Sequence, residues 1–186
     1  IGERFGEGNN RAGENFLEKI IQVPLKIPVA QQGALKDYFI ESINNVLKSN
    51  SISLSEEEME RFSNQFSTNI LIAVKTPRLI HRYTNSISFS IPLLNGEVNM
   101  VDLMLIEAVK VFYPEYYNFI KSNTEYFFRP RQRPQSRLDE PKEDPLSVNF
   151  ESLGRDISAR QKGSIKNLLS ELFPALNSVY YAFGYP

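Results

Sequence analysis

The sequence contains no cysteine and only one histidine, His81. Without cysteine, the chain has no disulfide bond, no thiolate nucleophile and no cysteine-bound zinc. A single histidine excludes a pair of histidine ligands, so we expect no zinc site, although carboxylates could still bind magnesium. No apolar run reaches the roughly 18 residues that a membrane-spanning helix needs.

The chain also lacks an excess of charge of either sign. It carries 21 basic and 22 acidic side chains in 186 residues, and its formal net charge is -1. A general polyanion-binding protein is therefore excluded, because the two charges cancel. With 41% hydrophobic residues, the composition is that of an ordinary globular protein. The chain begins with Ile1 rather than methionine, so we expect a processed chain or a piece of a longer protein, here called the full-length parent.

The first 28 residues are predicted to end in one short strand. Residues 1–14 are polar and rich in glycine, as in a flexible lead-in. Apolar residues then alternate with others from Ile21 to Ile27, and Pro24 restricts such a strand to the edge of a sheet. A strand has no stability without partners, so we expect the rest of the sheet upstream, in the full-length parent.

Residues 29–128 are predicted to form a helical bundle. Ser55 before three glutamates and Thr76 before Pro77 are both typical helix starts. Residues 101–112 are apolar on nearly every side, which predicts a helix in the middle of the bundle. Spacing of three or four residues predicts the other inner faces, which consist of Leu35, Phe39, Ile43 and Val46, of Met59, Phe62, Phe66 and Ile70, and of Ile80, Tyr83, Ile87 and Ile91.

The composition changes at residue 129. Four prolines and many charges punctuate residues 129–160, which we interpret as a linker or mobile arm, basic in its first half and acidic in its second. Residues 161–186 are predicted to form a final amphipathic helix. Its apolar residues are Ile165, Leu168, Leu169, Leu172, Phe173 and Leu176.

Three features suggest chemistry but have simpler interpretations. The glycines near the N-terminus lack the Gly-Lys-Ser/Thr of a phosphate-binding loop, so we interpret them as a loose terminus. The run from Leu103 to Glu107 is similar to the magnesium-site strand of nucleotide hydrolases, but its flanks have helical spacing, which favours a core helix carrying one acid. The arginines between residues 129 and 137 follow aromatic residues and could bind single-stranded nucleic acid. The acidic stretch after them favours a solvated linker.

A fourth feature is the one we favour, a cluster of side chains that can carry positive charge: Lys75, Arg78, His81 and Arg82. If a helix begins at Pro77, Arg78 lies in its first turn, where a cation opposes the helix dipole at a cost of about 0.3–1 kcal/mol. His81 and Arg82 follow three and four residues later, on the same side. A bound anion would resolve this conflict, because it would meet free backbone N–H groups and cations together.

The same cluster has structural interpretations. Arg78 could pair with an acid of the bundle, such as Glu107 or Glu18, because structural ion pairs also gather charge. His81 could be a buried, hydrogen-bonded ring. An acid–base role for His81 has little support, since no serine, aspartate or cysteine constellation surrounds it in the sequence.

Residues 17–28 read Leu-Glu-Lys-Ile-Ile-Gln-Val-Pro-Leu-Lys-Ile-Pro, and residues 76–85 read Thr-Pro-Arg-Leu-Ile-His-Arg-Tyr-Thr-Asn. Both resemble motifs of the KAP family of P-loop NTPases, in the order of that family, and residues 96–120 are similar as well. The chain departs from the family pattern in three ways. It has no P-loop, it has no magnesium-site acid, and His81 stands where lysine is usual.

The resemblance implies a part in a larger ATPase. KAP proteins are ATPases, often membrane-associated, and some bacterial members act in phage exclusion. Residues 1–28 would be the end of the ATPase core, and residues 29–128 would be a C-terminal lid. Arg78 would then act as a sensor arginine on the terminal phosphates of ATP, and Arg82 would support it.

We therefore predict a mainly α fold, a lid-like helical bundle with one short N-terminal strand. This bundle would sense which nucleotide is bound and would relay the state of that nucleotide to a protein partner. ATP and magnesium would bind only in the full-length parent, joined to the rest of the ATPase core, so this chain alone would not hydrolyse ATP. We expect a cytoplasmic location, at the inner face of a membrane only through the parent, and no nucleic-acid partner. The rival hypothesis is a helical protein–protein interaction module in which Arg78 is structural.

Overall fold

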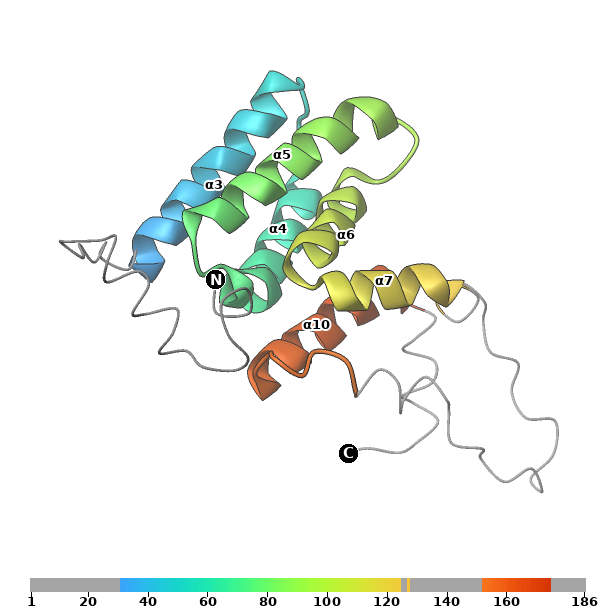
Figure 1. Ribbon diagram of the computed structural model, residues 1–186. Helices are drawn as coiled ribbons and strands as arrows, with labels where there is room; N and C mark the ends of the chain where they lie inside the picture. Colours follow the sequence, from blue (N-terminus) through green and yellow to red (C-terminus); the bar gives the residue numbers. More distant parts are fainter. Residues whose placement is uncertain (1–30, 125–126, 128–151, 175–186) are drawn as a thin grey trace, which may run out of the picture. The chain divides into compact units, whose positions relative to one another are not determined.

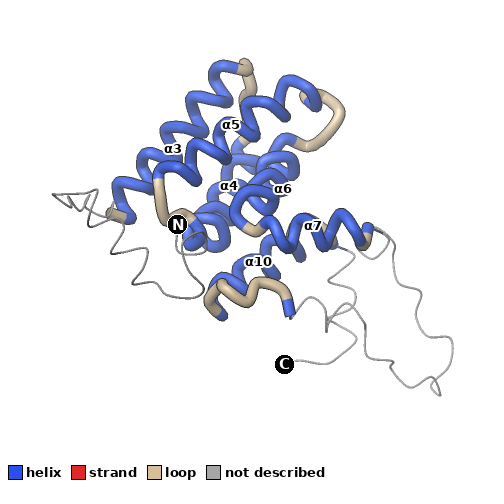
Figure 2. The backbone as a smooth tube through the Cα atoms, viewed as in Figure 1, coloured by secondary structure: helices blue, strands red, loops and turns tan. Residues whose placement is uncertain are grey.

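A computed structural model describes residues 31–124, 127 and 152–174 (Figure 1). These residues form α-helices and two short turns of other helix types, and they contain no strand (Figure 2). In chain order, the elements are α3 (Gln32–Ser49), α4 (Glu56–Gln65), the π-helix η1 (Phe66–Ile70), the 3-10 helix η2 (Leu71–Ala73), α5 (Pro77–Leu94), α6 (Met100–Phe112), α7 (Pro114–Ser122) and α10 (Ala159–Leu172). The predicted helical class is confirmed, and the strand predicted before residue 28 lies outside the described residues. Every helix in the described ranges is too short or too polar to cross a membrane.

Capping side chains explain where several helices begin. The Ser55 hydroxyl accepts a hydrogen bond from Glu58 N–H (3.2 Å), and the Glu58 carboxylate accepts one from Ser55 N–H (3.0 Å). This reciprocal pair satisfies two backbone donors that the helix itself leaves free, and it confirms the predicted start of α4. Ser158 and Gln161 form the same arrangement before α10, which therefore begins two residues earlier than residue 161, its predicted start.

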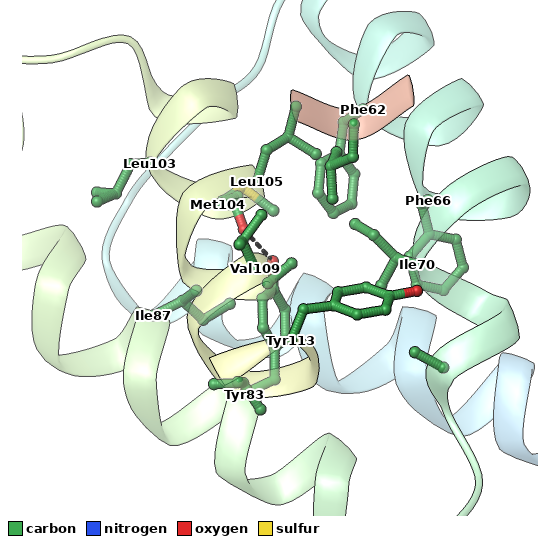
Figure 3. Close-up of a cluster of buried hydrophobic side chains, with 14 of the residues drawn as sticks. Phe62, Phe66, Ile70, Tyr83, Ile87, Leu103, Met104, Leu105, Val109 and Tyr113 are labelled. Atoms are coloured by element: carbon green, nitrogen blue, oxygen red, sulfur yellow. Dashed lines mark hydrogen bonds between the residues drawn. The ribbon is translucent and has the colours of Figure 1, made fainter. Parts of the chain in front are cut away.

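Helix α6 occupies the centre of the bundle, as its apolar composition predicts. It packs against α4, α5, α7 and α10. Its fully buried side chains are Val101, Met104, Leu105, Ala108 and Val109. Tyr83 of α5 lies against α6 and donates a hydrogen bond to the carbonyl of Met104 (3.1 Å), as Figure 3 shows. Burial raises the pKa of the Tyr83 hydroxyl, which keeps it protonated and able to donate this bond.

The inner faces of α3 and α5 agree with the apolar spacing. The buried residues of α3 are Leu35, Phe39, Ile43 and Val46, and the apolar ones of α5 are Ile80, Tyr83, Ile87 and Ile91. The prediction was wrong for Met59, which is 57% exposed, although Phe62, Phe66 and Ile70 of the same row are buried. Spacing fixes the side of a helix that carries apolar residues, but it does not fix how far along the helix a neighbour covers that side.

Residues 152–158 contact α7 and lead into α10. Gly154 N–H donates to the Glu115 carboxylate (2.9 Å), and the Tyr116 hydroxyl donates to the Leu153 carbonyl (3.3 Å). Helix α10 then packs against η1 and α6 and buries Ile165, Leu168 and Leu169. Part of the predicted linker, residues 129–151, lies outside the described residues, as does Leu176 of the predicted final helix. The rest of the predicted linker, residues 152–160, makes the contact with α7 and includes the first two residues of α10.

Candidate functional site

The first turn of α5 contains no acidic residue that would compensate the helix dipole. Thr76 has extended backbone (φ -147, ψ 151) and occupies the N-cap position, and Pro77 is the first helical residue, as predicted. The Thr76 side chain makes no capping hydrogen bond, and the first turn contains no acidic residue. The Thr76 carbonyl accepts a hydrogen bond from Leu79 N–H (3.1 Å). The positive end of the α5 dipole is therefore not balanced by a side chain of its own helix.

The structure places all four residues of the predicted site, Lys75, Arg78, His81 and Arg82, on the surface. The last three lie at positions i, i+3 and i+4 of α5 and so share one side of the helix. Within residues 31–124, 127 and 152–174, no ion pair involves Lys75, Arg78 or Arg82. These three cations are therefore open to an anion from outside the described residues.

His81 is attached to the neighbouring helix α3. Its Nε2 atom lies 2.9 Å from the Tyr38 hydroxyl, and the two rings meet edge to face with centroids 5.7 Å apart. A second contact, between Gln32 Nε2 and the Val74 carbonyl (3.5 Å), joins the first residue of α3 to the segment before α5. The two helices lie side by side in Figure 1. The sequence did not predict the role of Tyr38, because residues 43 positions apart meet only through tertiary packing.

Glu107, considered from the sequence as a partner of Arg78, has other partners. It is 7% exposed on α6 and accepts hydrogen bonds from Ser86, from Ser90 (2.8 Å) and from Lys110 (3.0 Å to each oxygen). The proposed Arg78–Glu107 ion pair is therefore wrong. The other suggested partner, Glu18, lies outside the described residues.

The environment of Glu107 favours its charged form. Burial alone would raise the pKa of the carboxyl group, but hydrogen bonds from Ser86, Lys110 and Ser90 outweigh it and hold the pKa below the ordinary value. Because Ser86 and Ser90 belong to α5, the carboxylate joins α5 to α6 from inside the bundle. Sequence spacing gave no sign of this cluster, since the serines are 21 and 17 residues away from Glu107.

The described residues fit phosphate groups better than magnesium. Arg78 and Arg82 suit phosphate oxygens, because a guanidinium group can donate two parallel hydrogen bonds. Glu107 lies on helix α6, as the helical spacing of the residues around it predicted, and the positive charge of Lys110 neutralises it. In the part of the chain that the structure describes, no three acidic or histidine side chains lie close enough to hold a metal ion. The glycines of residues 1–14 and the arginines of residues 129–137 are outside that part.

Comparison with known proteins places the start of α5 inside a family match. Residues 1–94 match the KAP family P-loop domain, and the match ends at Leu94, the last residue of α5. The chain is also 27% identical over 123 residues to the phage T7 exclusion protein of Escherichia coli K12. That similarity covers 66% of this chain but 16% of the relative, so the chain spans a small part of that protein's length. No solved structure matches the chain. Because the family match covers half of its 186 residues, the chain belongs to the KAP family of P-loop NTPases.

Proposed function

We propose that this helical bundle is the lid of a KAP ATPase and that Arg78 senses the terminal phosphate of ATP. The observation that carries the proposal is the pair of exposed arginines, Arg78 and Arg82, at an uncompensated helix start. Neither forms an ion pair with any described residue. The chain contains no Gly-Lys-Ser/Thr sequence, so the P-loop that would hold the nucleotide has to come from the rest of the full-length parent.

The γ-phosphate of ATP would relieve an electrostatic conflict at this helix start. Arg78 lies in the first turn of α5, where the helix dipole disfavours a cation. A phosphate group placed there meets the positive helix end and the guanidinium groups of Arg78 and Arg82 together. ADP lacks the phosphate that would complete this contact, so the site would distinguish ATP from ADP. Lys75, just before the helix, and His81, held by Tyr38, would border the same anion.

Helix α5 would relay this contact to the rest of the bundle. The Tyr83 hydroxyl is bonded to the Met104 carbonyl, and Ser90 is bonded to Glu107, both across the interface with α6. A helix fixed in this way cannot shift alone without breaking buried hydrogen bonds, so α5 and α6 would move together. A protein partner of the bundle would then meet a different surface in each nucleotide state.

Nucleotide affinity of the full-length parent carrying Arg78→Ala tests the proposal. A charge-assisted hydrogen bond contributes about 1.5–3 kcal/mol, which corresponds to roughly 10- to 150-fold in Kd. We expect Arg78→Ala to weaken binding of the slowly hydrolysed analogue ATPγS by about that factor and to change ADP binding little. Lys121→Ala is the control, because Lys121 is an exposed cation near the end of α7.

The rival function is a protein–protein interaction module without a nucleotide role. Exposed apolar side chains on α5, such as Phe89 (73% exposed), favour protein contact of some kind. Under that rival, Arg78→Ala leaves the affinities for both ATPγS and ADP equal to those of the wild-type parent. Such a result ends the sensing proposal.

A further inference from the structure

Five exposed residues follow one line along the outer side of α5: Arg78, Arg82, Asn85, Phe89 and Leu93. We call this line the outer row of α5. At about 100° per residue, its members fall within an arc of about 80° on the helix. The opposite side of α5 is buried, with Ile80, Tyr83, Ile87 and Ile91 all at 0% exposure. The outer row is thus cationic at its N-terminal end and apolar at its C-terminal end.

The apolar end is exposed to an unusual degree for residues of this kind. Phe89 is 73% exposed and Leu93 is 62% exposed. They lie four residues apart, so their side chains are neighbours on the helix surface. Val98, in the turn that follows α5, adds a third exposed apolar side chain at 44%. Exposed apolar side chains that cluster in this way mark a contact surface.

The length of the outer row determines what can cover it. At 1.5 Å per residue, Phe89 lies about 10 Å along the helix from Arg82, and Leu93 lies about 22 Å from Arg78. A phosphate group on the arginines cannot reach the apolar end. A protein surface that holds a phosphate near one edge and presents apolar side chains beyond it can cover both ends at once.

We propose that the outer row of α5 is a docking surface for the nucleotide-loaded P-loop core, with Phe89 and Leu93 as its apolar anchors. The inference rests on the proposed function, since it assigns the arginines to a phosphate held by that core. Charge disfavours a second copy of the same row, because the row contains no acid that could balance its partner's arginines in either a parallel or an antiparallel arrangement. Docking and sensing are then one event: the phosphate attracts the cationic end, and the anchors hold the apolar end.

Photo-crosslinking in the full-length parent tests the surface. A benzoylphenylalanine in place of Phe89 keeps an aromatic side chain at the apolar end and reacts with whatever lies against it under ultraviolet light. The same probe in place of Lys121 on α7 is the control. Mass spectrometry of the cross-linked peptides identifies the contact in the presence of ATPγS and in the presence of ADP.

We expect the probe at position 89 to react with a peptide of the P-loop core, several-fold more with ATPγS than with ADP. We expect Leu93→Ser to reduce that cross-link several-fold without lowering the melting temperature, because Leu93 is exposed. No reaction above that of the control probe, or reaction only with the nucleotide base or with peptides outside the core, overturns the inference. If Arg78→Ala weakens ATPγS binding while no core cross-link forms, the sensing role stands and the docking surface falls. A core cross-link that is equal in both nucleotide states overturns docking that depends on the phosphate, and nucleotide affinity unchanged by Arg78→Ala ends the sensing role as well.

Discussion

The substitution Glu107→Gln removes one negative charge from the interface between α5 and α6 while keeping the shape of the side chain. In the wild-type bundle, the carboxylate accepts hydrogen bonds from Ser86, Ser90 and Lys110. A glutamine keeps one acceptor oxygen but presents an N–H₂ group to the remaining donors. A serine hydroxyl that faces the N–H₂ group must turn from donor to acceptor, so the hydrogen bonds to a charged acceptor are lost, and Lys110 loses its counter-charge.

The size of the effect follows from these contacts. A hydrogen bond to a charged group contributes about 1.5–3 kcal/mol, and the glutamine recovers part of it, so we expect a loss of about 2 kcal/mol. For a chain of this length, each kcal/mol corresponds to about 2–4 °C in melting temperature, which gives a decrease of about 4–8 °C at pH 7. Helical content should be unchanged in the folded state, because α6 keeps its apolar residues.

The dependence on pH separates the lost charge from a simple packing defect. The pKa of Glu107 lies below its ordinary value of 4.5, so folding favours the charged form. This contribution to stability is complete above about pH 4.5 and is lost as pH falls through the lower, folded-state pKa. The difference in melting temperature between wild type and Glu107→Gln should therefore shrink in acid.

Thermal unfolding followed by circular dichroism, at a series of pH values from 7 down to 3, measures both quantities. Glu97→Gln is the matched control, because Glu97 is exposed in the turn between α5 and α6. We expect the control to change the melting temperature by less than about 2 °C at pH 7, as is usual for surface substitutions. Equal melting temperatures of Glu107→Gln and Glu97→Gln at pH 7, or a deficit of Glu107→Gln that stays constant down to pH 3, would refute the reasoning.

Two further predictions concern the C-terminal part of the bundle. Gly154→Ala should destabilise the fold by about 1–3 kcal/mol, because Gly154 has φ +63 and an added Cβ would lie 2.7 Å from the Ile157 side chain. The control Gly33→Ala has open space around its Cβ and should be neutral or slightly stabilising. Chemical denaturation compares the two variants, and equal stabilities would contradict the expectation. Arg61→Ala should lower the free energy of unfolding by about 1 kcal/mol, because Arg61 pairs with Asp102 (2.8 Å) and Glu171 (2.6 Å) in a half-exposed position. Amide hydrogen exchange in α10 should be faster in the variant than in the wild type, and this difference should be smaller in high salt. Unchanged exchange in α10 would mean that apolar packing alone holds this helix.

The sequence predicts those parts of the fold that depend on local chemistry. The start of α5 at Pro77 follows from the fixed φ of proline and its missing N–H group. The central position of α6 follows from its apolar character on all sides, since such a helix needs neighbours all round. The capping box at Ser55 follows from side-chain oxygens that reach backbone donors three residues away.

The remaining features depend on which segments meet after folding. The Tyr38–His81 contact joins residues 43 positions apart, and the apolar spacing of α3 says nothing about a partly buried tyrosine beside its inner face. Met59 fits the apolar row of α4 but is exposed. The sequence could not predict this, because the spacing of apolar residues does not show where a neighbouring helix ends. The cationic cluster at α5 is visible in the sequence, whereas the ligand that would balance it is not.

The buried acid in α6 connects the stability of the bundle to the direction in which α5 presents its outer row. An apolar residue of similar size at position 107 could stabilise the interface as well as the carboxylate does, so stability alone does not explain Glu107. Apolar packing tolerates small rotations of one helix against another, but Ser86 and Ser90 meet the carboxylate only when α5 has one orientation. Even a rotation too small to expose the apolar side chains of α5 would move the two serines off the carboxylate and change the direction in which Arg78 points. The hydrogen bonds on the inner side of α5 thus fix the orientation of the arginines on its outer side.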